Sequence, residues 1–395
     1  MKKIWQQIES EKDELIQLRR ELHRHPELAL HEYRTAERIE TELDKIDVEH
    51  HRIGETSVLG ILRGAGASEA AVALRADIDA LPIQELNESG YRSQTDGVMH
   101  ACGHDAHTTC LIGAARALAQ NRDCFGGEIR FFQSAEEIGK GAMDFIHAGL
   151  LKGVRRVFGL HVAPDLSLGT VGLKAGLNNA GVDHFAIHVQ GKSAHVATPQ
   201  LGVDALYIAS QIVVAIQPLI TRRTSPTEPE IIGIGILHAG TTYNALAETA
   251  ELEGTTRTIS AERRKTVRAW ITCVAEQTAA MYGGSAEVVW TGVCSPLIND
   301  ETACTEAGEV VDLPLGKRHV ITDRQFSLGG DNFSEYLLEV PGVYAYLGTG
   351  NPNRPETLHS IHNGHFELDE DALVTGAALY AGYALSVLKG NGNAS

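Results

Sequence analysis

The chain has 395 residues, enough for two or three domains of about 150 residues each. Its 34 Lys and Arg residues face 51 Asp and Glu residues, and the formal net charge of -17 repels nucleic-acid phosphates and anionic membrane surfaces. Six cysteines without a Cys-x-x-Cys pair argue against a disulfide framework and against a zinc ribbon. Composition therefore favours an acidic enzyme or binding protein without a nucleic-acid partner.

Membrane insertion is not expected from the apolar segments. The amino terminus turns polar before an apolar core of signal-peptide length can form. The apolar segment 205–220 is interrupted by polar residues and Pro218, and it falls short of the roughly 20 residues that span a bilayer. We expect a cytoplasmic protein with no membrane partner.

The first part of the chain alternates strands and helices. Apolar residues spaced for one helix face predict a helix over 3–24, which Pro26 ends. Asp105 is expected to cap a helix that runs to Leu118, and a helix over 140–150 should close near Gly149. Each of three apolar strands leads to acidic residues or an imidazole: 71–74, 128–132 and 154–158. Ligands bind beyond the carboxyl ends of strands in such sheets, so these side chains predict a site there.

The pattern changes near residue 181. The expected elements are a strand at 185–189, a helix at 202–221, strands at 230–237 and 248–258, a helix at 260–282 and a strand at 286–293. This βαββαβ order is ferredoxin-like. Strand and helix alternation resumes near residue 297 and ends in an apolar helix over 371–388.

The sequence therefore predicts an α/β catalytic domain whose mixed sheet carries helices on both faces. It is built from residues 1–180 and 297–395 and is interrupted by a ferredoxin-like lid or dimerisation domain at 181–296.

A short turn, Cys102-Gly103-His104, combines a thiol with an imidazole, and both are good ligands for borderline transition metals. A lone Cys-x-His is more often a buried cysteine beside a surface histidine. The turn gains weight from side chains downstream that could complete a dinuclear site: Glu136, Glu137, His161 and His362.

Two divalent cations at such a site would keep a net positive charge after binding one thiolate and one carboxylate. That charge lowers the pKa of a bound water toward about 7, so hydroxide forms at neutral pH. Glu136 is the expected base, since adjacent acids at a strand end can direct one carboxylate to metal and the other to water. A Glu-Glu pair alone is more often a solvated loop.

Asp77 and Asp79, two apart on a strand, share a face and are expected to orient the ligands from behind. The alternative is a merely polar strand end. His100, His107 and His359 flank the ligand candidates but are not expected to bind metal.

Six motifs together resemble the aminoacylase/carboxypeptidase family of dinuclear metallo-amidohydrolases, which includes hippurate hydrolase, N-acyl-amino-acid deacylases and hydrolases of indole-acetyl-amino acids. The resemblance covers nearly the whole chain. The motifs lie at residues 19–28, 75–82, 102–105, 135–137, 191–195 and 251–255.

The resemblance implies a metal-dependent amidohydrolase that cleaves N-acyl amino acids to a carboxylic acid and a free amino acid. Cys102 would be the bridging ligand and Glu136 the general base. The other implied ligands are His104, Glu137, His161 and His362. A thiolate ligand favours zinc over manganese on softness, but imidazole and carboxylate suit several ions. We therefore expect two ions of zinc or manganese per subunit, with nickel or cobalt as alternatives.

The resemblance also implies a homodimer or a tetramer. The lid of one subunit would contribute His195 to the active site of its partner, and Asn244 would lie near the substrate carboxylate. Taken alone, His195 is more often a surface-loop histidine and Asn244 a turn residue.

Three positions depart from the family pattern. Gly330-Asp331-Asn332 stands where Glu-Asp is usual, Ala245-Leu246-Ala247 replaces Val-Ile-Pro, and Gly364 replaces a proline. All three are expected around the substrate pocket. Two alternatives remain: a dipeptidase or carboxypeptidase on the same scaffold, and a non-catalytic metal-binding dimer.

Overall fold

The computed structural model describes residues 2–225, 227–316 and 319–389. The chain divides into two compact units. The large unit comprises Met1–Gly176, Ile298–Gln325 and Asn332–Ser395, and the small unit comprises Leu177–Leu297 and Phe326–Asp331. No pattern in the sequence indicated that the late segment Phe326–Asp331 belongs with the small unit.

The large unit contains most of the regular structure. Its helices are α1 (Lys2–Ser10), α2 (Lys12–Arg24), α3 (Tyr33–Asp44), α4 (His104–Ala119), α5 (Gly141–His147), α9 (Glu301–Leu315), α10 (Phe333–Glu339) and α11 (Ala372–Lys389). Its strands are β1 (Glu49–Ile53), β2 (Ser57–Arg63), β3 (Gly66–Asp77), β4 (Gly126–Ser134), β5 (Val154–Ser167), β6 (Val171–Gly172), β13 (Val320–Ile321) and β14 (Gly342–Gly350). Strands β7 (Gly176–Asn179) and β12 (Leu297–Asn299) form a separate two-stranded sheet.

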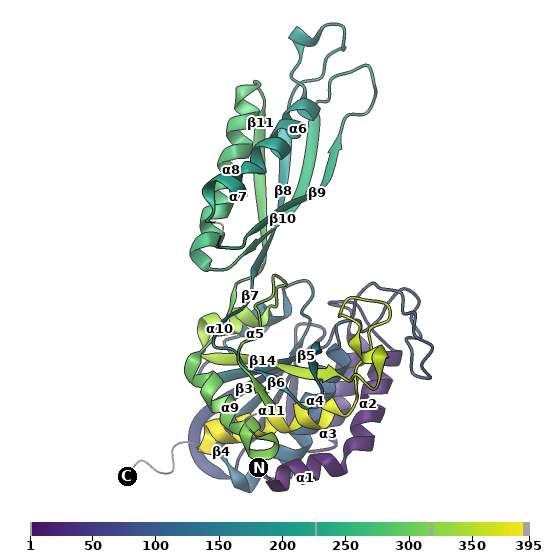
Figure 1. Cartoon of the computed structure of the whole chain (residues 1–395), viewed down its shortest axis with the longest axis vertical. Coiled ribbons are helices and arrows are strands. Elements are labelled where there is room, and N and C mark those ends of the chain that lie inside the picture. The colour runs from purple at the N-terminus through teal and green to yellow at the C-terminus, as the bar shows by residue number, and fades with distance from the viewer. Residues whose placement is uncertain (1, 226, 317–318, 390–395) are drawn as a thin grey trace. The chain divides into compact units, whose positions relative to one another are not determined.

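Within the described ranges, the large unit is built on an eight-stranded mixed sheet with the order β1-β2-β4-β3-β5-β14-β6-β13. Figure 1 labels the strands β3, β4, β5, β6 and β14 of this sheet. Strand β3 pairs in parallel with β4 and β5, and β5 pairs in parallel with β14. The register places Asp77 opposite Ser134. The carboxyl ends of β3 and β4 therefore meet at one edge, as the sequence predicted.

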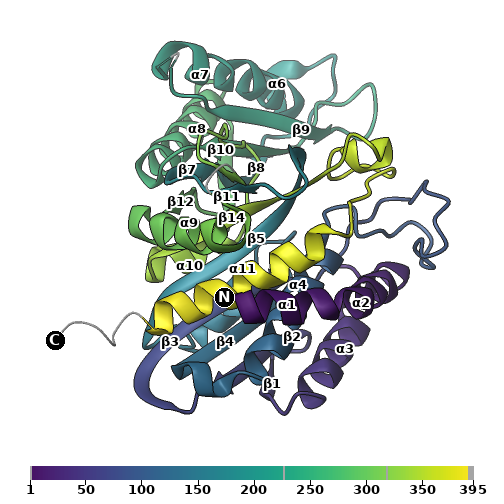
Figure 2. The same ribbon diagram turned by 60° about the horizontal axis from the view of Figure 1, so that its bottom comes forward.

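Helices cover both faces of this sheet. The ring of Phe158 on β5 packs against Tyr380 and Tyr383 of α11, with centroids 5.3 and 4.7 Å apart. The next residue, Gly159, faces the opposite side, where a Cβ would lie 2.8 Å from the ring of Phe333 on α10. On the side of the sheet that Phe158 faces, helix α11 lies beside α4 (Figure 2). The predicted α/β class with helices on both faces is confirmed.

Two details of the predicted helices are wrong. The helix expected over 3–24 is two helices, because Glu11 (φ -96°, ψ 7°) forms a turn between α1 and α2. Asp105 does not cap α4: Gly103 holds the N-cap position, and Asp105 lies in the first turn. Gly103 has φ +87°, and a Cβ there would lie 2.5 Å from Val162 Cγ2, so the turn requires glycine.

The small unit has the predicted βαββαβ order. Its elements are β8 (Gly181–Gln190), α6 (Ala205–Ile216), α7 (Pro218–Arg223), β9 (Ile231–Ala239), β10 (Thr249–Thr258), α8 (Ala261–Met281) and β11 (Ser285–Cys294). The sheet order is β11-β8-β10-β9, with antiparallel pairs. Pro218 lacks the N–H that a continuous helix needs, so the expected helix over 202–221 breaks into α6 and α7.

By length and composition alone, two helical segments of the described residues could span a membrane: Ala205–Arg223 and Ala372–Lys389. The expectation that the apolar segment at 205–220 is too short for a span is therefore not met. The second is α11, a core helix whose apolar window is 83% buried. In the first, only 33% of the apolar window is buried, and Leu206, Tyr207 and Val214 of α6 are exposed.

Candidate metal centre

Cys102 lies at the centre of a cluster of potential metal ligands. Its Sγ is 3.3 Å from Nε2 of His161, which lies within β5, and 3.3 Å from Nε2 of His362. The thiol is buried, and the left-handed Gly103 turns the chain directly after it into α4. One sulfur atom thus approaches imidazoles that come from two distant segments.

His362 is held in an unusual backbone conformation. Its φ is +60°, which for a residue with a Cβ costs on the order of 1 kcal/mol or more. Its N–H donates to the carbonyl of Ala101 at 2.8 Å, and its Nε2 lies 3.4 Å from Oε1 of Glu137. The strained residue is therefore tied to the cysteine turn and faces a carboxylate.

The described residues contain four groups of three potential ligand atoms, of which Asp77, His104 and His107 form one and His104, Glu136 and Glu137 another. The other two groups share Cys102. In each group the three atoms lie within 4.8 Å of one another: Cys102, His104 and His161 in one, and Cys102, Glu137 and His362 in the other. This arrangement suits two ions that share one sulfur ligand.

The donor set also fits metal by its chemistry. Nε2 of His104 and Oε1 of Glu137 are buried and have no hydrogen-bond partner within the described residues. Buried polar atoms of this kind require a partner of another kind. Burial raises the pKa of the Cys102 thiol, so the thiolate form needs a cation beside it.

Asp79 organises the ligands from behind. Its Oδ1 accepts a hydrogen bond from Nδ1 of His104 at 3.0 Å, which leaves Nε2 of that ring for a metal. Its two oxygens also accept the N–H groups of Glu136 and Glu137, each at 2.9 Å. One carboxylate therefore orients a histidine and the acidic pair together.

Asp77 has a similar position at the end of β3. It binds Nη1 of Arg75 at 2.8 Å and makes a short contact with Nδ1 of His107. Nε2 of His107 accepts the N–H of Val162 at 2.9 Å, so both ring nitrogens are occupied. Although burial opposes ionisation, the neighbouring histidines and Arg75 hold the pKa of Asp77 well below its usual range.

Glu136 follows the carboxyl end of β4 and is half-buried. Its Oε1 accepts the N–H of Asn332 at 3.2 Å. Asn332 belongs to a segment that departs from the family pattern and was expected around the substrate pocket. It contacts the acidic residue that the sequence suggested as the base.

A buried charge network lies behind the cysteine turn, and the sequence did not reveal its role. Arg19 and His23 of α2 both reach Asp105, at 2.7 and 2.8 Å, and Asp105 follows His104 directly. Burial and Arg19 lower the pKa of His23, but Asp105 and Glu85 outweigh them and raise it to about 9. One sequence signal could have indicated this network: Arg19 and His23 lie four residues apart on the apolar face of a predicted helix, where buried charged side chains need partners.

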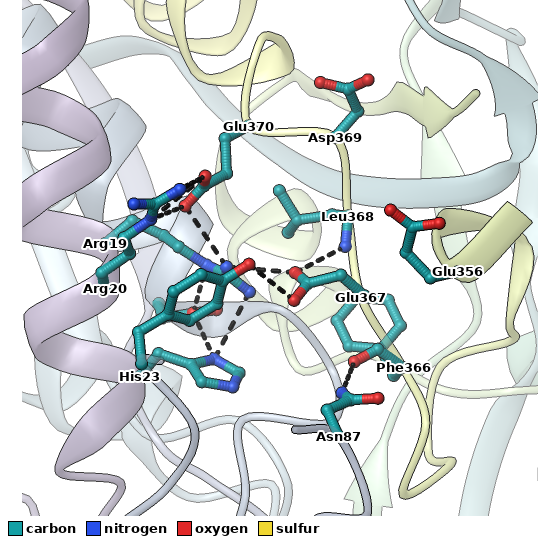
Figure 3. A network of polar contacts seen from close by, with 12 residues as sticks. Arg19, Arg20, His23, Asn87, Glu356, Phe366, Glu367, Leu368, Asp369 and Glu370 are labelled. Atoms are coloured by element: carbon teal, nitrogen blue, oxygen red, sulfur yellow. Dashed lines mark hydrogen bonds and ion pairs between the residues drawn. The ribbon is translucent and has the colours of Figure 1, made fainter. Parts of the chain in front are cut away.

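The same network connects α2 to the segment that precedes α11 (Figure 3). Arg20 makes hydrogen bonds to both carboxylate oxygens of Glu370, with its closest contact at 2.6 Å. Arg19 lies 3.1 Å from Glu367. Segment 366–370 follows His362 in the chain, so these ion pairs help to fix the loop that carries this candidate ligand.

His195 and Asn244 belong to the small unit, whereas the metal-ligand candidates and Glu136 belong to the large unit. His195 pairs with Ala245, and the carbonyl of Asn244 accepts the N–H of Val196 at 3.1 Å. The N–H of Ala197 donates to Nδ1 of His195 at 3.0 Å, so Nε2 carries the ring proton. The structure brings the two predicted substrate residues together.

The Ala245-Leu246-Ala247 departure lies in this same region. The N–H of Leu246 donates to the carbonyl of Ala194 at 2.8 Å, so the segment pairs with the loop that carries His195. The third departure also has a physical reason, because a Cβ at Gly364 would lie 2.6 Å from the carbonyl of Gln84.

Comparison with known proteins gives a consistent result. The chain matches peptidase family M20/M25/M40 over residues 73–386. It is 40% identical over 364 residues to an N-acetyl-L-cysteine deacetylase of Bacillus subtilis, covering 91% of this chain and 85% of the relative. It is 34% identical over 386 residues to thermostable carboxypeptidase 2 of Saccharolobus solfataricus, covering 96% and 97% of the two chains.

A solved structure agrees with these relatives. A dinuclear metal-binding peptidase of the M20 family from Bacillus subtilis superposes with a TM-score of 0.82 at 35% identity, covering 96% of this chain and 99% of that one. Fold, family match and ligand cluster lead to one conclusion: the chain belongs to peptidase family M20/M25/M40 and is a hydrolase that acts on amide bonds.

Proposed function

We propose that this protein hydrolyses N-acyl amino acids to a carboxylic acid and a free amino acid. The observation that carries the proposal is the pair of ligand groups that share Cys102, with Glu136 directly beside the ligand candidate Glu137. The deacetylase among the relatives supports an acyl substrate. The substrate would have a free carboxylate next to the scissile amide.

Two divalent ions per subunit would be held by the shared Cys102 and four further ligands. The dinuclear relative supports this number, and zinc or manganese suits the donor set best, with nickel or cobalt as alternatives. When bound, such ions supply Lewis-acid chemistry and make water more acidic. The four further ligands are His104, Glu137, His161 and His362.

Glu136 would act as the general base and acid. It would take a proton from the water that attacks the amide carbonyl and deliver it to the leaving nitrogen. Asp79 and Asn332 hold its main chain and carboxylate. Nε2 of His195 would donate to the developing oxyanion, and Asn244 would bind the substrate carboxylate.

A homodimer would allow His195 to act at the partner's site. The exposed side of α6 supports an interface, because Leu206, Tyr207 and Val214 all face outward. Tyr207 also packs against the ring of Tyr282 at the end of α8, with centroids 5.0 Å apart, and Met281 extends the apolar surface. We also propose a cytoplasmic location without nucleic-acid or membrane partners, supported by the net charge of -17.

The second candidate is a carboxypeptidase or dipeptidase, favoured by the thermostable carboxypeptidase among the relatives. Hydrolysis of N-acetyl, N-benzoyl and indole-acetyl amino acids should be compared with hydrolysis of dipeptides on protein loaded with each metal. A higher kcat/KM for acyl amino acids is expected. Preference for dipeptides would favour the second candidate, and no hydrolysis of any compound would favour a non-catalytic metal-binding dimer.

A further inference from the structure

The side-chain amide of Asn332 and its main-chain N–H both make contacts near the end of β4. Its side chain is fully buried. Its Oδ1 accepts from Nη2 of Arg75 at 2.6 Å, and its Nδ2 donates to the carbonyl of Ala135 at 2.9 Å and approaches that of Glu136 at 3.4 Å. Its main-chain N–H donates to Oε1 of Glu136 at 3.2 Å. Asn332 therefore holds both the backbone and the carboxylate of Glu136.

Because its side chain makes these contacts, Asn332 does not cap helix α10 with its side chain. Asn332 occupies the N-cap position of α10, where asparagine ordinarily accepts an N–H of its own helix and adds about 1 kcal/mol of stability. It makes no such bond here. The amide is directed at the acidic pair instead, although the two residues are 196 positions apart in the chain.

An amide suits this position better than a carboxylate does. Arg75 requires an acceptor, whereas the carbonyls of Ala135 and Glu136 require a donor; an amide supplies both, and a carboxylate supplies only the acceptor. Arg75 is buried and already has the carboxylate of Asp77 at 2.8 Å. A second carboxylate at position 332 would place negative charge beside Glu136 and against two carbonyl oxygens.

We infer that Asn332 is a positioning residue for the proposed general base Glu136. The inference rests on the proposed function. Because a general base must point at the proton it removes, loss of the amide should reduce kcat without weakening metal or substrate binding.

The first test is the Asn332→Ala variant of the metal-loaded protein, assayed with an N-acetyl amino acid. We expect kcat to fall by about 10-fold or more, part of the 10²- to 10⁴-fold that a general base contributes, while KM changes less than about 2-fold. Metal content should stay at the wild-type value. Wild-type kcat in this variant would overturn the inference.

Asn121→Ala is the matched control. Asn121 is also buried, and its Nδ2 donates to Gln7 at 2.9 Å and to the carbonyl of Ala117 at 2.8 Å. It follows the far end of α4, about 24 Å from His104 along the helix. This control should lose thermal stability but keep kcat. An equal loss of kcat in both variants would make Asn332 merely structural and overturn the inference.

A double-mutant cycle tests whether Asn332 acts through Glu136. In the Glu136→Gln background, Asn332→Ala should cause no further fall in the residual kcat, since the base is already absent. An equal fold-change in both backgrounds would overturn the inference. A Glu136→Gln variant with normal turnover would instead refute the proposed role of Glu136, and inactive wild-type protein would refute the proposed function.

Asn332→Asp is a second variant that keeps the size of the side chain, so the inference can still be tested if Asn332→Ala misfolds. It retains an acceptor for Arg75 but lacks the donor toward Ala135, so kcat should again fall while the protein remains folded by circular dichroism. Wild-type kcat in Asn332→Asp would show that the donor is dispensable and would overturn the inference.

Discussion

Cys102 differs from the other cysteines in its surroundings. The described thiols at Cys110, Cys294 and Cys304 are also buried, yet only Cys102 lies between two imidazoles at 3.3 Å. Cys102 belongs to two of the three-residue groups, one with His161 and one with His362, which supports its proposed role as the shared ligand. In the proposed site, the thiolate would balance charge for both ions.

Replacing Cys102 with serine should lower metal content, because a neutral hydroxyl does not replace a shared thiolate. Elemental analysis after dialysis measures the stoichiometry. Cys273→Ser, which alters an exposed thiol, is the matched control and should keep its metal. Unchanged stoichiometry in Cys102→Ser would mean that Cys102 is only a small buried side chain.

Glu136 is the proposed base, whereas the adjacent Glu137 is a candidate metal ligand, so replacing Glu136 should affect turnover and leave metal content unchanged. Glu136→Gln should keep bound metal and reduce turnover by about 10²-fold or more, the usual scale for a general base. Steady-state kinetics and elemental analysis on the same preparation separate the two effects. Glu309→Gln alters an exposed residue of α9 and should change neither quantity. Near-normal turnover in Glu136→Gln would remove this residue from the mechanism.

At the scale of elements, α2 is the helix whose observed role differs most from the expected one. The sequence indicated an amphipathic helix, and Leu15, Leu18 and Leu22 are indeed buried. The same face buries Arg19 and His23 against Asp105 in the first turn of α4. A helix expected only to pack also carries charges that fix the start of α4, next to His104.

The pKa of His23 predicts how stability changes with pH. It rises from 6.5 to about 9 on folding, so protonated His23 stabilises the fold fully below about pH 6.5, and this contribution is lost as pH rises through 9. Its size is at most about 3 kcal/mol. Urea unfolding of wild type and His23→Gln, both metal-loaded, should show a stability difference that shrinks between pH 6.5 and 9. A constant difference would contradict the prediction.

At the scale of the molecule, the two units divide the predicted machinery. The metal-ligand candidates lie in the large unit, while His195 and Asn244 lie in the small unit. If His195 serves the partner subunit's site, as proposed, complete sites require residues from two chains. The exposed apolar side of α6 offers a surface for such an assembly.

Mixing two inactive variants tests this arrangement. His195→Ala and Glu136→Gln should each be nearly inactive, but a heterodimer would contain one site with both defects and one with neither. Refolding an equal mixture should restore activity toward about a quarter of wild type for random pairing. Tagged heterodimers isolated without recovered activity would show that His195 serves its own subunit's site or none.

Local chemistry was sufficient to predict much of this protein. Hydrophobic periodicity predicted the βαββαβ order of the small unit, because each strand and helix buries one face at a fixed period. Strand ends with acids or imidazole predicted an edge where Asp77, Glu136 and Glu137 meet, since parallel strands align their carboxyl ends. Breaks at Glu11 and Pro218 were missed because apolar spacing continues across them.

Only the tertiary structure decided how the site is supported. The sequence determined which donor types are present, but the sharing of Cys102 between two groups depends on imidazoles 59 and 260 positions away. The contact of Arg19 with Asp105 and that of Asn332 with Glu136 likewise join distant segments. No local pattern encodes such contacts, because the packing of helices against the sheet that contains β4 brings these side chains together.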